Sequence, residues 1–224
     1  NYDGVARYRR VLPLPAERRA HVAIEFRAVA THATVRINGV EVGQHLGGWT
    51  PFRVDATQAL QWNGADVLEV LVDEKVGHNT QGFHPIVQPH FGGIWQDVTL
   101  CLDQHPTLDR FDAFAFGTAD GTLRAAATVL GNGAAIDGLS WTVTVRAGDK
   151  ALASSMQALA GPGRAELQLR CPGVQPWAPG RPQLYDVVFE LRAGGALLDT
   201  HTQRVGFRDL RADGHQVLWN GEPL

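Results

Sequence analysis

Short segments of alternating apolar and polar residues run through most of the chain and restrict it to β-structure more than any other feature. Residues 22–27, Val-Ala-Ile-Glu-Phe-Arg, show the two-residue period of a half-buried strand. Asn38-Gly39 lies between two such segments. It is a strong hairpin signal, because both turn positions favour positive φ. A sustained 3.6-residue apolar stripe is absent from the sequence. The pattern predicts an all-β fold.

The strand pattern breaks near residues 103–106, Asp-Gln-His-Pro, and restarts beyond them. Such short strands, separated by glycine and proline turns, are typical of antiparallel β-sandwiches. The length of 224 residues fits two domains of roughly 100 residues each. We therefore expect two sandwiches in tandem. The expected strands are 22–27, 35–37, 40–42, 67–72, 94–102, 108–116, 122–130, 139–145, 165–169, 187–191 and 197–205.

Charge and hydropathy exclude two kinds of partner. The net charge is −3, and the basic residues form no stripe that would favour nucleic acid. The sequence has neither a cationic amphipathic helix nor an apolar run long enough to span a bilayer. We expect neither a nucleic-acid nor a membrane partner. Cys101 and Cys171 lie in apolar strand-like segments, so we expect two buried free thiols.

Several motifs follow one another in a fixed order. They are Tyr8-Arg9-Arg10, the stretch 38–52 with Gly47-Gly48-Trp49-Thr50-Pro51-Phe52, Gly93-Ile94-Trp95, Pro176-Trp177-Ala178-Pro179, Val205-Gly206-Phe207-Arg208 and the ending 218–224. This order resembles the start of family 2 glycoside hydrolases, the group of β-galactosidases, β-glucuronidases and β-mannosidases. The resemblance implies a galactose-binding-like jelly-roll β-sandwich followed by an immunoglobulin-like β-sandwich. Asp66 departs from it, since the family often has Asn there, and Gln96 stands where Arg is common.

The same resemblance implies a division of the chain into three parts. Residues 1–104 would form the sugar-binding jelly roll, and residues 105–208 the immunoglobulin-like domain. Residues 209–224 would be the leading hairpin of a catalytic (β/α)₈ barrel, which needs about 250 residues more. In the family the two catalytic glutamates lie on that barrel. We therefore expect this chain to be the non-catalytic front part of a retaining β-glycosidase. Its partners would be its own catalytic domain and, through it, a carbohydrate substrate, with no cofactor.

The acidic residues of the chain offer no catalytic pair of their own. A retaining glycosidase needs two carboxyl groups about 5–5.5 Å apart. Asp73-Glu74 is the most suggestive couple, but neighbouring strand residues point to opposite faces. No strained Gly-x-Ser-x-Gly turn is present for a serine nucleophile. We assign no catalytic residue.

One loop, residues 77–92, gathers polar side chains suited to ligands. It holds His78, His84 and His90 together with Gln88. A metal site is one alternative, although the spacing matches no usual zinc pattern. A plain solvated loop is another. Because the family's first domain often lends late-loop residues to the sugar pocket, we take His84, Gln88 and His90 as candidate substrate-binding residues and assign no metal ligand.

The aromatic residues Trp49 and Trp95 allow two interpretations. Their indole rings could stack on the C–H face of a sugar, or they could pack in the jelly-roll core or at its interface with the barrel. We expect packing, because burial of a Trp side chain stabilises a core strongly. The main alternative function is a free-standing carbohydrate-binding module. A purely structural pair of adhesive sandwiches is a third hypothesis.

Overall fold

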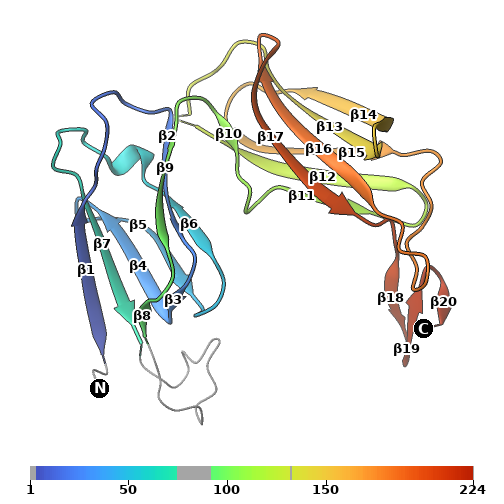
Figure 1. The fold of residues 1–224 in the computed structure, drawn as a ribbon, viewed down its shortest axis with the longest axis horizontal. Helices are drawn as coiled ribbons and strands as arrows, with labels where there is room; N and C mark the ends of the chain where they lie inside the picture. Colours follow the sequence, from blue (N-terminus) through green and yellow to red (C-terminus); the bar gives the residue numbers. More distant parts are fainter. Residues whose placement is uncertain (1–3, 75–91, 132, 224) are drawn as a thin grey trace. The chain divides into compact units, whose positions relative to one another are not determined.

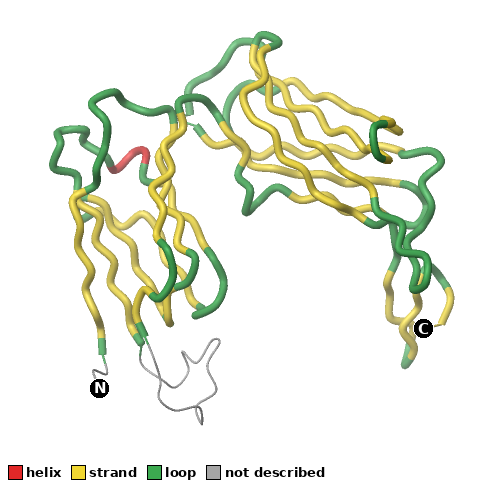
Figure 2. Tube along the Cα trace, in the orientation of Figure 1, coloured by secondary structure: helices red, strands yellow, loops and turns green. Residues whose placement is uncertain are grey.

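The computed structural model describes residues 4–74, 92–131 and 133–223, which form two compact units, Asn1–His105 and Pro106–Leu224 (Figure 1). Strands make up nearly all the regular structure, and the described residues contain no α-helix (Figure 2). The predicted fold class, a jelly-roll sandwich followed by an immunoglobulin-like sandwich, is confirmed. None of the described helices has the length and hydropathy to cross a membrane.

The first unit is a sandwich of two antiparallel sheets. Their strand orders are β1-β7-β4-β5 and β6-β2-β9, and β3 and β8 form a separate short pair. The core lies between the sheets and includes Ile24 and Phe26 from one layer and Val35 and Val70 from the other. The elements are β1 (Val5–Val11), β2 (His21–Phe26), β3 (Val29–Ala30), β4 (His32–Ile37), β5 (Val40–Leu46), β6 (Phe52–Asp55), the 3-10 helix η1 (Thr57–Ala59), β7 (Val67–Asp73), β8 (Gly93–Ile94) and β9 (Val98–Asp103).

The Asn38-Gly39 hairpin is confirmed. Ile37 pairs with Val40, which leaves the two turn residues at φ +52° and +82°. The strand predicted at 67–72 is central, since β7 lies between β1 and β4.

Two strand predictions of the first unit need correction. Residues 22–27 were expected to be half-buried, but every residue of β2 is buried. Ala23 pairs with β6 and β9 on either side, and Glu25 is covered by ion pairs with Arg27 and Arg53. Residues 94–102 were expected to form one strand, but residues 95–97 separate β8 from β9.

The second unit is also a sandwich. One sheet has β12 at its centre, paired with β10 and β11 along one side and with β15 along the other. The facing sheet has the order β14-β13-β16-β17. Trp141 and Phe189 are fully buried between the two layers. The strands are β10 (Thr107–Leu108), β11 (Phe114–Gly117), β12 (Thr122–Leu130), β13 (Leu139–Ala147), β14 (Lys150–Ala158), β15 (Gly163–Arg170), β16 (Tyr185–Ala193) and β17 (Ala196–Val205).

A small third sheet follows the second sandwich. Its strands β18 (Leu210–Asp213), β19 (Gln216–Trp219) and β20 (Glu222–Pro223) pair in sequence order. It belongs to the same compact unit as the sandwich before it. The three-part division at residues 104 and 208 remains a proposal.

The two cysteines are unpaired, and they differ in exposure. Cys171 is buried, whereas Cys101 is only partly so. The prediction of two buried thiols is therefore wrong for Cys101, whose strand β9 lies at the edge of its sheet. Burial raises the pKa of both thiols, that of Cys171 to about 11. Neither sulfur has the low pKa of a reactive thiolate.

Candidate functional site

The candidate substrate-binding residues His84, Gln88 and His90 lie outside the described residues and stay predictions. The suggestive acidic couple, Asp73 and Glu74, ends strand β7. Their backbones close the strand end, because the Asp73 carbonyl accepts from Thr31 N at 3.2 Å and the Glu74 N donates to the Gly4 carbonyl at 3.4 Å. These contacts favour a structural role for both residues.

One histidine lies between two carboxylates in the first unit. His21 Nδ1 is 3.0 Å from Asp103 Oδ2, and its Nε2 is 3.9 Å from Asp55 Oδ1. The imidazole is fully buried, and Nε2 has no hydrogen-bond partner. A general base must reach the proton that it removes. The buried ring of His21 cannot reach a proton of a substrate. It instead links β2 to the end of β9 through the contact of its Nδ1 with Asp103.

A cluster of aromatic side chains occupies the bend between β5 and β6. The indole rings of Trp49 and Trp95 meet edge to face, with centroids 5.0 Å apart and planes at 74°. Trp95 Nε1 donates a hydrogen bond of 2.9 Å to the Gly48 carbonyl. The imidazole of His45 stacks on Phe52 at 4.3 Å, and Phe52 stacks on the buried Phe26 at 4.7 Å. The bend is thus joined to the core by a column of flat rings.

The polar atoms of this cluster fix its geometry further. His45 Nε2 and Thr50 Oγ1 form a 3.0 Å hydrogen bond across the bend. Desolvation, helped by the nearby His32, lowers the pKa of His45. His45 is therefore neutral at neutral pH, and its ring can both donate and accept.

Of the two packing positions expected for Trp49, the jelly-roll core is wrong, and the interface with the barrel stays a prediction. Its side chain is 53% exposed, whereas Trp95 is partly buried. Gly47, at φ +134°, lies in the bend just before Trp49, and Trp95 packs against the Trp49 ring and donates a hydrogen bond to the Gly48 carbonyl of the same bend. The Gly-Gly-Trp-Thr-Pro sequence signalled the bend, but it did not signal which indole would be exposed.

An apolar hollow of about 440 Å³ opens in the first unit beside β1. Its lining includes Ile24, Phe26 and Leu68, with the side chains of Arg9 and Arg10 among the few polar groups. The lining residues include no carboxylate and no histidine. The hollow can therefore bind apolar groups, and Tyr8, Arg9 and Arg10 are its polar lining residues.

The second unit has an exposed apolar face on the outside of β11, β12 and β15. Phe114 pairs with Ala126, and Phe116 with Arg124, so all four side chains share this outer face. The two phenyl rings are 47% and 46% exposed. They border a hollow of about 580 Å³ over the small Ala126 side chain. We call Phe114, Phe116, Arg124, Ala126 and Glu166 the β11 face.

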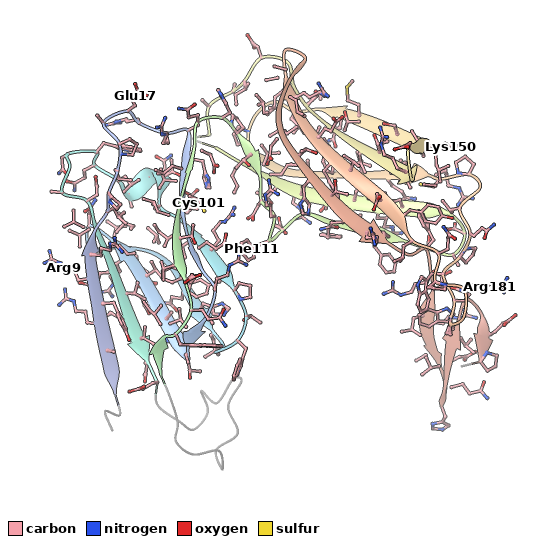
Figure 3. All side chains as sticks on the ribbon, in the orientation of Figure 1. Arg9, Glu17, Cys101, Phe111, Lys150 and Arg181 are labelled. Atoms are coloured by element: carbon pink, nitrogen blue, oxygen red, sulfur yellow. The ribbon has the colours of Figure 1, made fainter. Side chains whose placement is uncertain are left out.

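A second, more polar hollow of about 610 Å³ lies where the third sheet meets the segment before β16. Gln175, Arg181, Asn220 and Glu222 are among the residues that line it. Figure 3 labels Arg181 beside this small sheet. Across the described ranges, no three His, Cys, Asp or Glu residues converge in a way that could hold a metal ion.

Comparisons with known proteins place both units in one group. The model described as "Glycosyl hydrolase 2 galactose-binding domain-like" matches residues 4–93. The model described as "Glycosyl hydrolases family 2" matches residues 119–208. The two matches fall on the first and the second sandwich respectively.

The curated relatives are named as glycosidases. A β-galactosidase of Thermoanaerobacter pseudethanolicus is 30% identical over 212 residues, which is 91% of this chain and 28% of the relative. A β-glucuronidase of Formosa agariphila is 26% identical over 260 residues, covering all of this chain and 25% of the relative. The chain thus spans little more than a quarter of the length of these relatives.

Solved structures agree over the full chain. β-Glucuronidase 2 of Bacteroides uniformis superimposes with a TM-score of 0.72 at 26% identity and covers 100% of this chain. The match takes up 29% of that enzyme's chain.

Proposed function

The chain belongs to family 2 of the glycosyl hydrolases, and on that premise we propose that it is the non-catalytic front part of an enzyme that hydrolyses β-glycosidic bonds with retention. In this proposal the jelly roll forms one wall of the sugar pocket. The immunoglobulin-like sandwich acts as a spacer that docks on the catalytic domain. The parent enzyme is an O-glycosyl hydrolase of the β-galactosidase and β-glucuronidase kind.

One observation carries the proposal. The family 2 matches fall on the two sandwiches, whereas about three quarters of each relative's length lies outside the part that this chain matches. A (β/α)₈ barrel of about 250 residues fits within that remainder. The described side chains supply none of the barrel's own machinery, since His21 is buried and Asp73 and Glu74 end a strand.

The β11 face supports the spacing role. An exposed apolar patch on a soluble domain usually marks an interaction site. Phe114 and Phe116 expose two phenyl rings side by side, with Arg124 and Glu166 at their borders. Apolar rings with a polar border are the pattern of a protein interface. We assign this face to the docking of the parent enzyme's catalytic domain.

A hydrolysis assay tests the proposal. The purified chain, incubated with 4-nitrophenyl β-galactoside, β-glucuronide and β-mannoside, should release nitrophenol no faster than buffer. An intact family 2 β-galactosidase serves as the positive control. The absence of paired carboxylates on a barrel is the physical reason for the expected result.

Turnover that scales with chain concentration and survives repeated purification would contradict the proposal. In that case Asp73→Asn and Glu74→Gln would show whether the acidic couple at the end of β7 is responsible.

A further inference from the structure

The aromatic side chain of Trp49 is unusual for its exposure. Among the described residues no other aromatic side chain is as exposed, at 53%. Exposing so large an apolar surface to water is unfavourable, by roughly 25 cal/mol per Å². An indole held in this position is open to a partner that covers it, either a ligand or the barrel of the parent enzyme.

The ring of Trp49 is held in place by its surroundings. The two indole rings meet edge to face at a centroid distance of 5.0 Å, and Trp95 is itself fixed by the 2.9 Å hydrogen bond from its Nε1 to the Gly48 carbonyl. On the other side of the bend, Thr50 is bonded to His45 at 3.0 Å. A side chain that is already ordered loses little conformational entropy when a ligand binds.

The glycine before the bend is needed for this presentation. Gly47 has φ +134°, a conformation that side-chain-bearing residues rarely adopt. The turn, the two indoles and the His45–Thr50 bond thus form one preorganised unit.

The chemistry of this unit selects the class of ligand. A flat indole suits the C–H face of a pyranose ring, and the exposed residues next to the two indoles in the chain, Thr50 and Gln96, are polar. Apolar faces with a few polar groups beside them are typical of small-ligand sites. The β11 face differs, since it places two phenyl rings side by side. We propose that Trp49 is the stacking platform of a carbohydrate subsite on the jelly roll, with Trp95 as its positioning residue.

The proposal rests on the carbohydrate chemistry of the proposed function, and it is tested on this chain alone by nitrogen-15 NMR. The indole N–H signals are followed during titration with methyl β-galactopyranoside and methyl β-glucopyranosiduronic acid, and with the open-chain polyol sorbitol for comparison. We expect saturable shifts at Trp49 and Trp95 with a dissociation constant of about 1–10 mM, and no saturable shift with sorbitol.

Three variants test whether the two indole rings are responsible for sugar binding. Trp49→Ala should weaken binding by about tenfold or more, whereas Trp49→Tyr keeps a flat ring and should keep most of the affinity. Trp95→Phe removes the bond to Gly48 and should weaken binding less than Trp49→Ala does. Phe111→Ala, which removes another exposed aromatic ring, is the matched control and should leave affinity unchanged.

Two results would overturn the proposal that Trp49 is a stacking platform. One is the absence of saturable shifts at Trp49, or equal affinity in Trp49→Ala with its amide spectrum still that of a folded protein. The other is self-association in sedimentation that depends on Trp49 with no response to sugar, which would assign the ring to a contact between copies of this chain. Both results leave the hydrolysis assay unaffected, so failure of this inference can be told apart from failure of the proposed function.

Discussion

At the scale of single residues, Asp66 shows how one buried carboxylate organises a loop. It is 1% exposed and accepts hydrogen bonds from Gln61 N at 2.7 Å, Trp62 N at 2.9 Å and Asn38 Nδ2 at 2.7 Å. Burial alone would raise the pKa of Asp66, but the hydrogen bonds from Gln61, Asn38 and Trp62 outweigh it and lower the pKa below its ordinary value. The charged form is therefore the stable one in the folded protein.

We expect the stability contributed by Asp66 to depend on pH. A carboxylate with a lowered folded pKa stabilises the fold above the unfolded pKa of about 3.9, and the contribution is lost as pH falls through the folded pKa. Asp66→Asn should remove this pH-dependent contribution to the free energy of unfolding. Asp66→Ala should lower the free energy of unfolding by about 3 kcal/mol at neutral pH. Urea unfolding from neutral pH to below pH 4 measures both.

The matched control is Asp137→Asn, since Asp137 is exposed. It should unfold like the wild type over the same pH range. Equal acid sensitivity in the wild type and Asp66→Asn would contradict the assignment.

At the scale of elements, the small sheet β18–β20 is held to its sandwich by few contacts. The indoles of Trp177 and Trp219 pack at 5.0 Å, and the Trp177 carbonyl accepts from Trp219 Nε1 at 3.1 Å and from Asn220 Nδ2 at 3.0 Å. Strand β18 is exposed along its whole length. Trp177 is therefore structural.

Trp219→Ala should unfold this sheet locally. The variant loses the ring contact and one hydrogen bond, so amide exchange in β18 and β19 should speed up by about tenfold or more. Exchange in β13 and β16 should not change. Val217→Ala removes an exposed side chain from the same strand and is the control. Slower or unchanged exchange in Trp219→Ala would contradict the anchoring role.

Element positions were predictable where the pattern is strong. Strand β12 has the bounds expected from the alternation in residues 122–130, because its inward side chains are apolar. Strand β14, Lys150–Ala158, was missed. Most of its residues are small or polar, and it lies at a sheet edge with little burial. Its position is set by eight register pairs with β13, which depend on tertiary structure.

At the scale of the whole molecule, the β11 face is the surface that we propose for docking of the parent enzyme's catalytic domain. Ala126 faces outward yet is only 3% exposed, because its neighbours on β11 and β15 cover it. The phenyl rings of Phe114 and Phe116 remain accessible. The guanidinium of Arg164 also lies over Phe114, 5.4 Å from its centroid.

Replacing both rings should separate folding from docking. Phe114→Ser with Phe116→Ser should change the unfolding free energy of this chain by no more than about 0.5 kcal/mol per site, because both rings are exposed. In the full-length enzyme the same pair should lower the melting temperature of the catalytic domain. Calorimetry on both proteins measures this. The control is Met156→Ser, which is 69% exposed and lies on β14 of the other sheet. An unchanged full-length enzyme would contradict the docking assignment.

The sequence by itself determined the fold class, the Asn38-Gly39 hairpin and the family, because alternation, turn chemistry and motif order are local properties of the chain. The tertiary structure decided which side chains are exposed. It buried both faces of β2, left Trp49 exposed beside the partly buried Trp95, and left the phenyl rings of Phe114 and Phe116 uncovered on the outer face of β11. The physical reason is that exposure depends on what packs across each sheet and bend, and those neighbours come from distant parts of the chain.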